Sequence, residues 1–281
     1  EPDQCLNGTR TPGPNPCSDS NACTIDLCGG GGSCTYNVVD CNDNDPCTNA
    51  SCDPSTGCAY SNNTSACTDN NPCTLGDVCS GGVCLPGASP APLQFCNNGA
   101  ITIPTGGAAT PYPAAITVAG QPSYLCSMTV ELRGFTANSY PDEVDVMLAR
   151  ETGLNAVVMS GVGGSGEVTG VNLTLSDAAA TSLPDNGPLV SGTFKPTNIG
   201  SGDIFPGPAP APTGGSVLSH FRGTNPNGSW NLWVDDASDY VSHAVAGDTQ
   251  SSFTGWCVNV VSACLRNADC DDDDECTTDV C

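Results

Sequence analysis

The stretch GSWNLWVDD, residues 228–236, decides the fold of the larger part of this chain. Trp230, Leu232 and Val234 form one apolar series, and they alternate with Asn231 and Trp233. Successive side chains of a β-strand point to opposite faces of the sheet. A period of two therefore predicts a strand with one face buried in an apolar core.

The same alternation recurs through the middle of the chain, where Gly and Pro residues separate the alternating segments. No helical stripe of useful length is present, although residues 177–182 are compatible with one turn. Many short strands with turn signals between them predict a β-sandwich or barrel. The alternating apolar positions are Met128, Val130 and Leu132, then Val144, Val146 and Leu148, then Val171, Leu173 and Leu175.

Five runs of this region also carry a family resemblance. They are GGAATPYPAAITVAG (106–120), VELRGFTANSYPDEVDVMLARETG (130–153), SLPDNGPLVSGTFKPTN (182–198), FRGTNPNGSWNLWVDD (221–236) and GWCVNV (255–260). These runs resemble the P-domain, a jelly-roll β-sandwich found behind subtilisin-like convertases and in many secreted bacterial proteins. The resemblance implies a jelly-roll fold over about residues 96–262. The loop from Asp239 to Asp248 is longer than in the usual pattern.

Cysteine spacing predicts a different architecture for the first 85 residues. The runs CSDSNACTIDLC (17–28), CNDNDPCTNASC (41–52) and CTDNNPCTLGDVC (67–79) share an acidic-polar first gap followed by Cys-Thr. Each run is completed by a fourth cysteine, so the segment is a tandem repeat. It resembles the cysteine-rich repeat of slime-mould extracellular matrix proteins over residues 17–84 and in the C-terminal tail.

The repeats contain too few large apolar residues to bury a core that offsets chain entropy. Crosslinks must hold them, each contributing about 2–4 kcal/mol, and the connectivity stays open from spacing alone. So many cysteines indicate a secreted protein with disulfides. We expect disulfides at Cys5, Cys17, Cys23, Cys28, Cys34, Cys41, Cys47, Cys52, Cys58, Cys67, Cys73, Cys79, Cys84, Cys96, Cys126, Cys257, Cys264, Cys270, Cys276 and Cys281.

Within the predicted sandwich, a bridge between Cys126 and Cys257 is expected to join the second strand to the last. A bridge from Cys96 to Cys126 or to Cys264 is the alternative.

The tail CDDDDECTTDVC, residues 270–281, repeats the spacing of the first three cysteines of a module. If the end is joined to the start, Cys281 is followed by four residues and Cys5, which completes the module. This predicts an array of copies joined head to tail, either in one long polyprotein or as separate subunits. A boundary that falls at this point by chance is the alternative.

These patterns predict seven parts. They are half of a split repeat with a linker (1–16), three Cys-rich repeats (17–40, 41–66 and 67–85), a Pro/Ala linker (86–95), the P-domain-like β-sandwich (96–263), and the other half of the split repeat (264–281).

Charge excludes several classes of partner. The chain has 30 acidic and 6 basic residues, for a net charge of -24. Such a surface repels phosphate backbones, so we expect no nucleic-acid partner, and no apolar run is long enough for membrane insertion. Calcium would be attracted. The candidate calcium ligands are Asp142, Glu143, Asp145, Asp235, Asp236 and Asp239, in preference to the acidic residues of the repeats. A solvated acidic surface is the alternative.

No enzymatic activity is predicted. His220 and His243 are the two histidines, and neither accompanies a Gly-x-Ser-x-Gly elbow. The run GVGGSG (161–166) matches a dinucleotide-binding pattern, but the strand-like EVTGVNLTL follows it instead of the required helix, so it is read as a loop.

Sequons support secretion and predict glycans at Asn7, Asn49, Asn62, Asn63, Asn172 and Asn227. The leading hypothesis is an extracellular structural protein, one repeating unit of a fibre, sheath or matrix that polymerises with copies of itself. The rival is a module that binds carbohydrate or a protein partner, with Trp233 or Tyr112 as an exposed sugar platform. The alternative for these two aromatic residues is that both simply pack.

Overall fold

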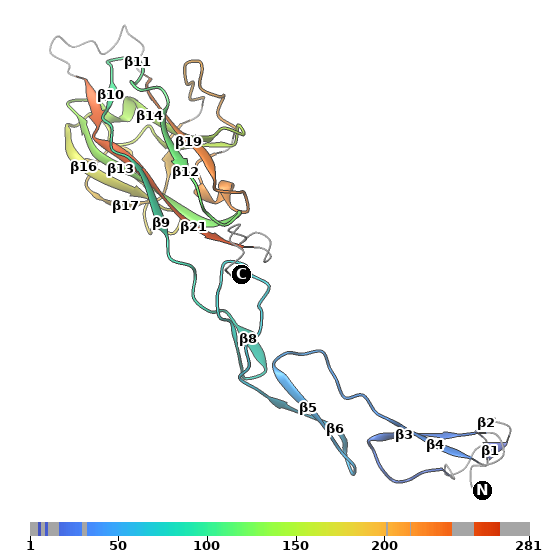
Figure 1. Cartoon of the computed structure of the whole chain (residues 1–281). Coiled ribbons are helices and arrows are strands. Elements are labelled where there is room, and N and C mark those ends of the chain that lie inside the picture. The colour runs from blue at the N-terminus through green and yellow to red at the C-terminus, as the bar shows by residue number, and fades with distance from the viewer. Residues whose placement is uncertain are drawn as a thin grey trace. The chain divides into compact units, whose positions relative to one another are not determined.

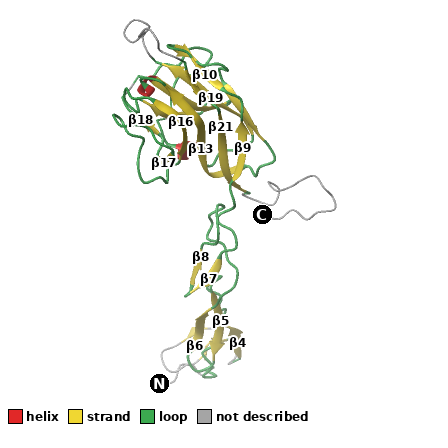
Figure 2. Ribbon diagram, turned by 90° about the vertical axis from the view of Figure 1, so that its left-hand side faces the viewer, coloured by secondary structure: helices red, strands yellow, loops and turns green. Residues whose placement is uncertain are grey.

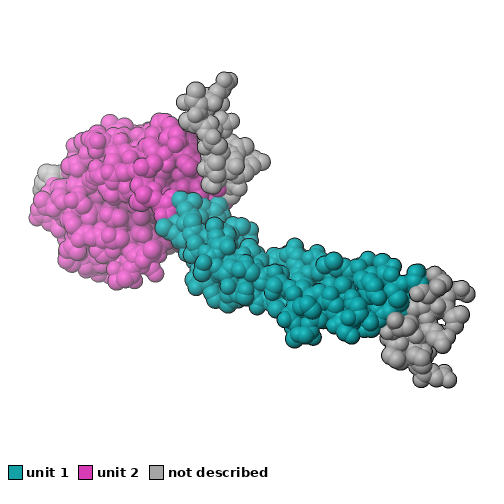
Figure 3. All heavy atoms as spheres, turned by 60° about the horizontal axis from the view of Figure 1, so that its bottom comes forward, with its two compact units in different colours: residues 1–88 teal, residues 89–281 magenta. Residues whose placement is uncertain are grey.

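The computed structural model describes residues 17–29, 33–200, 202–213, 215–237 and 250–264, and the backbone of two short strands, β1 (Cys5–Leu6) and β2 (Thr9–Arg10). The chain forms two compact units, residues 1–88 and 89–281 (Figure 3). Strands dominate the described residues, which contain short 3₁₀ turns and no α-helix. The predicted class, a β-sandwich with small disulfide-rich repeats, is confirmed.

The first unit is built from one β-hairpin per repeat (Figure 1). The third and fourth cysteines of each repeat lie opposite one another in the antiparallel register, as Cys52 and Cys58 do. Large apolar side chains stay exposed, Val38 by 82%, whereas Cys17 and Cys47 are almost fully buried. The hairpins are β3 (Thr24–Cys28) with β4 (Cys34–Val38), β5 (Thr48–Asp53) with β6 (Gly57–Asn62), and β7 (Val78–Ser80) with β8 (Val83–Leu85).

The second unit is a sandwich of two sheets (Figure 2). The seven-stranded sheet has the order β10-β20-β13-β16-β17, and β21 joins β13 to β9. Its strands are β9 (Leu93–Asn97), β10 (Ile101–Ile103), β13 (Tyr124–Ala137), β16 (Val168–Leu175), β17 (Gly192–Phe194), β20 (Ser251–Phe253) and β21 (Gly255–Ala263).

The six-stranded sheet has the order β11-β19-β14-β15-β18, and β12 also pairs with β19. Two strand pairs, β15 with β18 and β16 with β17, are parallel, and the other pairs of the sandwich are antiparallel. The strands of this sheet are β11 (Gly107–Ala108), β12 (Ala114–Val118), β14 (Val144–Arg150), β15 (Asn155–Ser160), β18 (Thr197–Asn198) and β19 (Gly228–Asp236).

The core lies between the two sheets and contains the apolar series predicted from alternation. Trp230, Leu232 and Val234 are buried there, and Phe135 stacks on Phe253 with ring centroids 4.7 Å apart. Arg150 extends over the Trp230 ring at 4.4 Å and donates to the carbonyls of Pro226 and Asn227. This buried guanidinium fixes the loop that leads into β19.

The outer face of the six-stranded sheet is also covered, which alternation did not predict. Every residue of β14 and β15 is buried. A second apolar cluster forms on this face from Met147, Ala149, Val157, Phe205 and Trp233. The Pro-rich segment after Phe205 supplies the cover, because the Tyr112 hydroxyl donates to the Pro206 carbonyl at 2.9 Å and the Tyr112 ring meets Trp233 edge-on.

This packing removes the expected sugar platform. Trp233 is only 6% exposed and Tyr112 is half-buried, so neither presents an open ring face to solvent. The prediction that these aromatic residues form an exposed carbohydrate platform is therefore wrong.

The expected bridge between Cys126 and Cys257 is also wrong, and so is the alternative pairing of Cys96 with Cys126 or Cys264. Cys96 is joined to Cys257, because β9 pairs with β21 and places these two residues opposite one another, with Cα atoms 4.1 Å apart. Cys126 lies at a β-bulge of β13 and does not face Cys257. The β13 residue that lies opposite Cys257 is Glu131. Cys126 and Cys264 each take part in a disulfide.

Candidate functional sites

The first gap of each of the three described repeats folds into the same hydrogen-bonded loop. In the second repeat, Asp43 Oδ1 accepts bonds from the Asp45 amide at 3.0 Å and from the Thr48 hydroxyl at 3.0 Å. Asp45 Oδ1 accepts from the Cys47 amide at 2.8 Å. The threonine after the second cysteine is therefore the residue that closes the loop, which gives a physical reason for the Cys-Thr motif.

The other two repeats make the same bonds. Thr24 donates to Asp19 and Thr74 donates to Asp69, each at 3.0 Å. The residue after each of these aspartates has a positive φ, which is 61° at Ser20, 58° at Asn44 and 62° at Asn70. Asparagine tolerates this left-handed conformation better than most residues, so it suits this position in two of the three loops.

The loops use the acidic residues of the repeats as hydrogen-bond acceptors. Bonds from the Asp45 amide and the Thr48 hydroxyl lower the pKa of Asp43. In the third repeat, Asp77 accepts from the amides of Asp69 at 3.0 Å and Gly87 at 2.8 Å, and these bonds lower its pKa. These carboxylates stabilise turns.

Two kinds of disulfide organise the repeats. Within a repeat the first cysteine pairs with the fourth, in Cys17–Cys34, Cys41–Cys58 and Cys67–Cys84. Between repeats the second cysteine of one pairs with the third of the next, in Cys23–Cys52 and Cys47–Cys79. Each described repeat is thus closed on itself and bonded to its neighbour, a connectivity that spacing alone left open.

Some sulfurs of neighbouring disulfides also cluster. Those of Cys41, Cys52 and Cys58 lie within 4.8 Å of one another, as do those of Cys47, Cys67 and Cys84. All six belong to disulfides, and zinc requires thiolate ligands. These clusters therefore bind no zinc while the bridges are intact.

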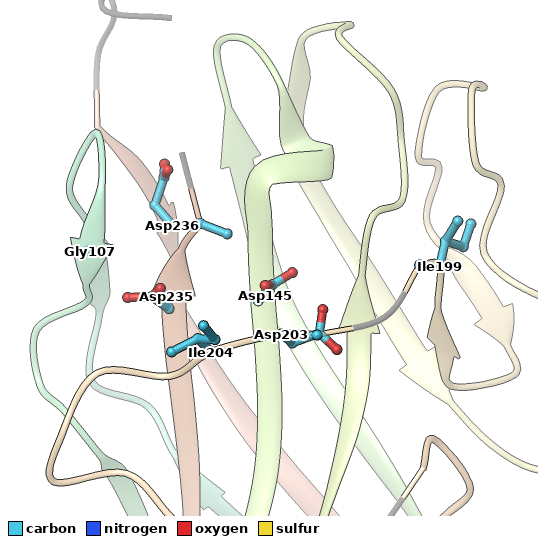
Figure 4. Close-up of a pocket in the computed structure, with 10 residues that line it drawn as sticks. Gly107, Asp145, Ile199, Asp203, Ile204, Asp235 and Asp236 are labelled. Atoms are coloured by element: carbon cyan, nitrogen blue, oxygen red, sulfur yellow. The ribbon is translucent and has the colours of Figure 1, made fainter. Parts of the chain in front are cut away.

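An acidic pocket lies on the outer face of the six-stranded sheet (Figure 4). Its volume is about 500 Å³, and no lining residue carries a positive charge. We call it the acidic pocket. The lining residues are Gly107, Asp145, Ile199, Gly200, Gly202, Asp203, Ile204, Asp235, Asp236 and Ala237.

Strand register brings the main carboxylates together. Asp145 of β14 lies directly opposite Asp235 of β19, so the two side chains share a face of the sheet. Asp203 comes from the segment that follows β18, and its Oδ1 accepts from the Ser160 hydroxyl at 3.0 Å. Its Oδ2 accepts from the Asn198 side-chain amide at 2.6 Å, which fixes Asp203 beside the end of β15.

Burial and mutual repulsion raise the pKa of two of these carboxyls, those of Asp145 and Asp235. Burial, followed by the charges of Asp145 and Asp236, raises the pKa of Asp235 to about 7. Burial also raises the pKa of Asp145 to about 6, and a hydrogen bond with Ser160 offsets part of that increase. Asp145 and Asp235 are each only 4% exposed. Without a cation, the pocket disfavours the charged forms of both groups.

The structure brings three of the six residues of the predicted metal set together. Asp145, Asp235 and Asp236 line the acidic pocket, whereas Asp142 and Glu143 lie in the 3₁₀ turn η2 (Pro141–Glu143) and do not. Asp239 lies outside the described residues. Asp203 was missed, because it belongs to a Gly-rich stretch with no strand pattern, and only the fold brings it to Ser160.

The sequons differ in their environment. Asn49, Asn62 and Asn172 are exposed, and Asn63 is half-buried with its amide nitrogen donating to the Pro46 carbonyl. The Asn227 amide nitrogen donates to the Gln121 carbonyl at 2.6 Å and to Asn225 at 2.9 Å. Asn7 lies outside the described residues.

Comparisons with known proteins agree with the repeats. A family model described as the Dictyostelium (slime mold) repeat matches residues 16–37 and 40–62. Protein psiD of Dictyostelium discoideum is 34% identical over 106 residues, which cover 32% of this chain and 21% of that protein. The chain thus spans about a fifth of the length of this relative. The third repeat is outside the family match but shares its loop bonds and its first-to-fourth disulfide.

One solved structure is similar at low level. It is the complex of the Aeromonas sobria serine protease with its chaperone, with 10% identity, a TM-score of 0.31, and coverage of 77% of this chain and 36% of that one. A likeness of this size supports no assignment, and the P-domain resemblance of the sandwich stays a prediction. No helix among the described residues has the length and apolar character needed to cross a membrane.

Proposed function

We propose that this protein is an extracellular structural protein, a unit of a matrix or fibre, in which the Cys-rich repeats act as a covalent tether. The observation that carries this proposal is the pair of bridges between repeats, Cys23–Cys52 and Cys47–Cys79. A module that only presents a binding surface has no need for neighbouring repeats to be bonded to one another.

Tension along the chain would follow the disulfides. Each first-to-fourth bridge bypasses a hairpin, with a sequence separation of 17 residues in every repeat. In the sandwich, Cys96 lies on the first strand and Cys257 lies on the last, and their bridge closes a separation of 161 residues. Force that enters at β9 therefore passes directly to β21, and the enclosed residues carry no load.

Polymerisation would occur through copies of the same chain. The tail sequence of residues 270–281 has the residue types of the repeat loop, with Asp272, Thr277 and Asp279 at the positions of Asp19, Thr24 and Asp26. Cys5 of another copy has the spacing of a fourth cysteine for this tail. We propose head-to-tail assembly by completion of this split repeat, with glycans and acidic side chains on the outside and no catalytic role.

Electron microscopy of native material tests the proposal. We expect long fibres that survive detergent and shorten or disperse after a thiol reductant is added. Iodoacetamide without reductant is the matched control and should leave the fibres intact. Dispersed particles in the untreated material would reject the fibre proposal.

A further inference from the structure

The acidic pocket combines ligands of one chemical kind. Four carboxylates line it, those of Asp145, Asp203, Asp235 and Asp236, together with three glycines, and Ser160 adds a hydroxyl beside Asp203. Oxygen ligands with several negative charges are the set that calcium prefers. The lining offers no nitrogen or sulfur side chain, which argues against zinc or copper.

A second observation is independent of the clustering. Asp235 is 4% exposed, and its Oδ1 has no hydrogen-bond partner among the described residues. Buried polar atoms are nearly always paired, and a buried charged oxygen without a partner is especially unfavourable. A cation in the pocket would satisfy this oxygen, which no described donor of the protein does.

The carboxylates of the protein alone are spread apart. The described residues contain no three carboxylate oxygens within 4.8 Å of one another. Asp203 is able to approach the strands, because it follows Gly202, and Gly200 and Gly202 both have positive φ angles near 95–99° that suit a pliable loop.

We propose that the acidic pocket binds one Ca²⁺ ion, held by the carboxylates of Asp145, Asp203 and Asp235. Calcium accepts six to eight oxygens in irregular geometry, including backbone carbonyls and water, whereas magnesium demands near-ideal octahedral geometry. A pocket of about 500 Å³ leaves room for bound water. The ion would connect β14 and β19 to the segment that precedes Phe205, which begins the cover over Trp233.

This inference is independent of the fibre proposal and is tested on the soluble full chain. After treatment with a chelator, CaCl₂ is titrated by calorimetry, and the melting temperature is recorded with and without the ion. We expect one site per chain with a Kd of about 10⁻⁴ M. At 100 times the Kd, the melting temperature of the sandwich should rise by about 5–10 °C.

Three variants make the test specific. Asp203→Asn changes a loop residue, so it should fold normally, and it should weaken binding at least tenfold. Asp235→Asn should raise the melting temperature of the metal-free chain and abolish the calcium-dependent increase. The exposed Asp185→Asn is the control for loss of charge and should bind like the parent. The proposal is overturned if calcium gives no heat and no thermal shift at 10 mM, if magnesium gives the same Kd, or if both pocket variants bind like Asp185→Asn.

Discussion

Cys47 of the second repeat is bonded to Cys79 of the third, although 32 residues separate them along the chain. Cys47 is 1% exposed and Cys79 is 2% exposed, so this bridge occupies the centre of a segment whose large apolar side chains face solvent. The disulfides replace the apolar core that such short repeats cannot form. A structure held in this way resists extension by covalent bonds, and we expect the same bonds to make it resistant to heat and detergent.

The bridge between Cys96 and Cys257 predicts a specific mechanical response. In a Cys73→Ser background, where no bridge from the third repeat can bypass the sandwich, single molecules are pulled from the two ends. They should show no extension step from the sandwich while the bridge between Cys96 and Cys257 is intact. Cys126 lies inside this loop and is itself disulfide-bonded, so the variant must remove it as well. Replacing Cys96, Cys126 and Cys257 by serine in this background should add a step of about 550 Å, given a separation of 161 residues and about 3.4 Å per extended residue. Atomic-force spectroscopy measures this difference, and an equally long step in the oxidised parent would contradict the load path.

The Cys-Thr motif predicts a local effect of removing one hydroxyl. Thr48→Val keeps the shape of the side chain but removes the donor to Asp43, so the loop should open more often. We expect faster hydrogen exchange at the amides of Asp45 and Cys47, which bond to side chains of this loop. Thr48→Ser retains the hydroxyl and is the matched control. Equal exchange in the two variants would show that the hydroxyl does not hold the loop.

The acidic pocket predicts an unusual pH dependence for the metal-free sandwich. The pKa values of about 7 for Asp235 and about 6 for Asp145 lie above the unfolded value of roughly 3.9. The folded state therefore binds more protons than the unfolded state between about pH 4 and pH 7. Stability should therefore fall as pH rises from about 4 to 7 and change little above that range. In addition to burial, the charges of Asp203 and Asp236 contribute to the raised pKa of Asp145, that of Asp236 also raises the pKa of Asp235, and no lining residue is basic.

Melting curves in chelator at pH 5 and pH 8 measure this dependence. The parent should melt several degrees higher at pH 5, and Asp235→Asn should reduce the difference because it removes the group with the higher pKa. A parent that is more stable at pH 8 than at pH 5 would contradict the raised pKa values of Asp145 and Asp235.

The alternation of apolar residues predicted the strands. It did not predict features that depend on contacts with distant segments of the chain. Trp230, Leu232 and Val234 face the core as their alternation requires. The burial of Trp233 was not predicted, because Phe205 and the loop after it cover this residue. The sequence of the strand that contains Trp233 gives no sign of this contact. The pairing of Cys96 with Cys257 depends on which strands are neighbours, and spacing along the chain does not contain that information.

Glycan occupancy should differ between the sequons, depending on whether the amide nitrogen of the asparagine already donates hydrogen bonds. Asn172 is exposed, and the bond from the Gly134 amide uses only its oxygen, so a glycan on the nitrogen is compatible with the fold. A glycan on Asn227 would disrupt at least one of the two bonds that its nitrogen donates. Enzymatic deglycosylation in ¹⁸O water, followed by peptide mass spectrometry, should label Asn172 and leave Asn227 unlabelled. Full occupancy of Asn227 would contradict this ranking.

The connectivity of the repeats also predicts the bridge that follows the third repeat. Cys73 is a second-position cysteine and is disulfide-bonded. The second-to-third rule seen at Cys23–Cys52 and Cys47–Cys79 therefore assigns it a third-position partner. Cys281 lies outside the described residues, but in the sequence it has the third position of the run that starts at Cys270.

We predict that Cys73 pairs with Cys281, so that the repeat array continues across the inserted sandwich. Digestion of native material with pepsin at low pH, which prevents disulfide exchange, should release a linked peptide pair that contains these two cysteines. The pair should separate on reduction, and the Cys96–Cys257 pair serves as the internal control for correct mapping. A peptide that links Cys73 to Cys276 would mean that the rule ends at the third repeat. A peptide that links Cys73 to Cys28 of another copy would follow the rule but contradict the pairing within one chain.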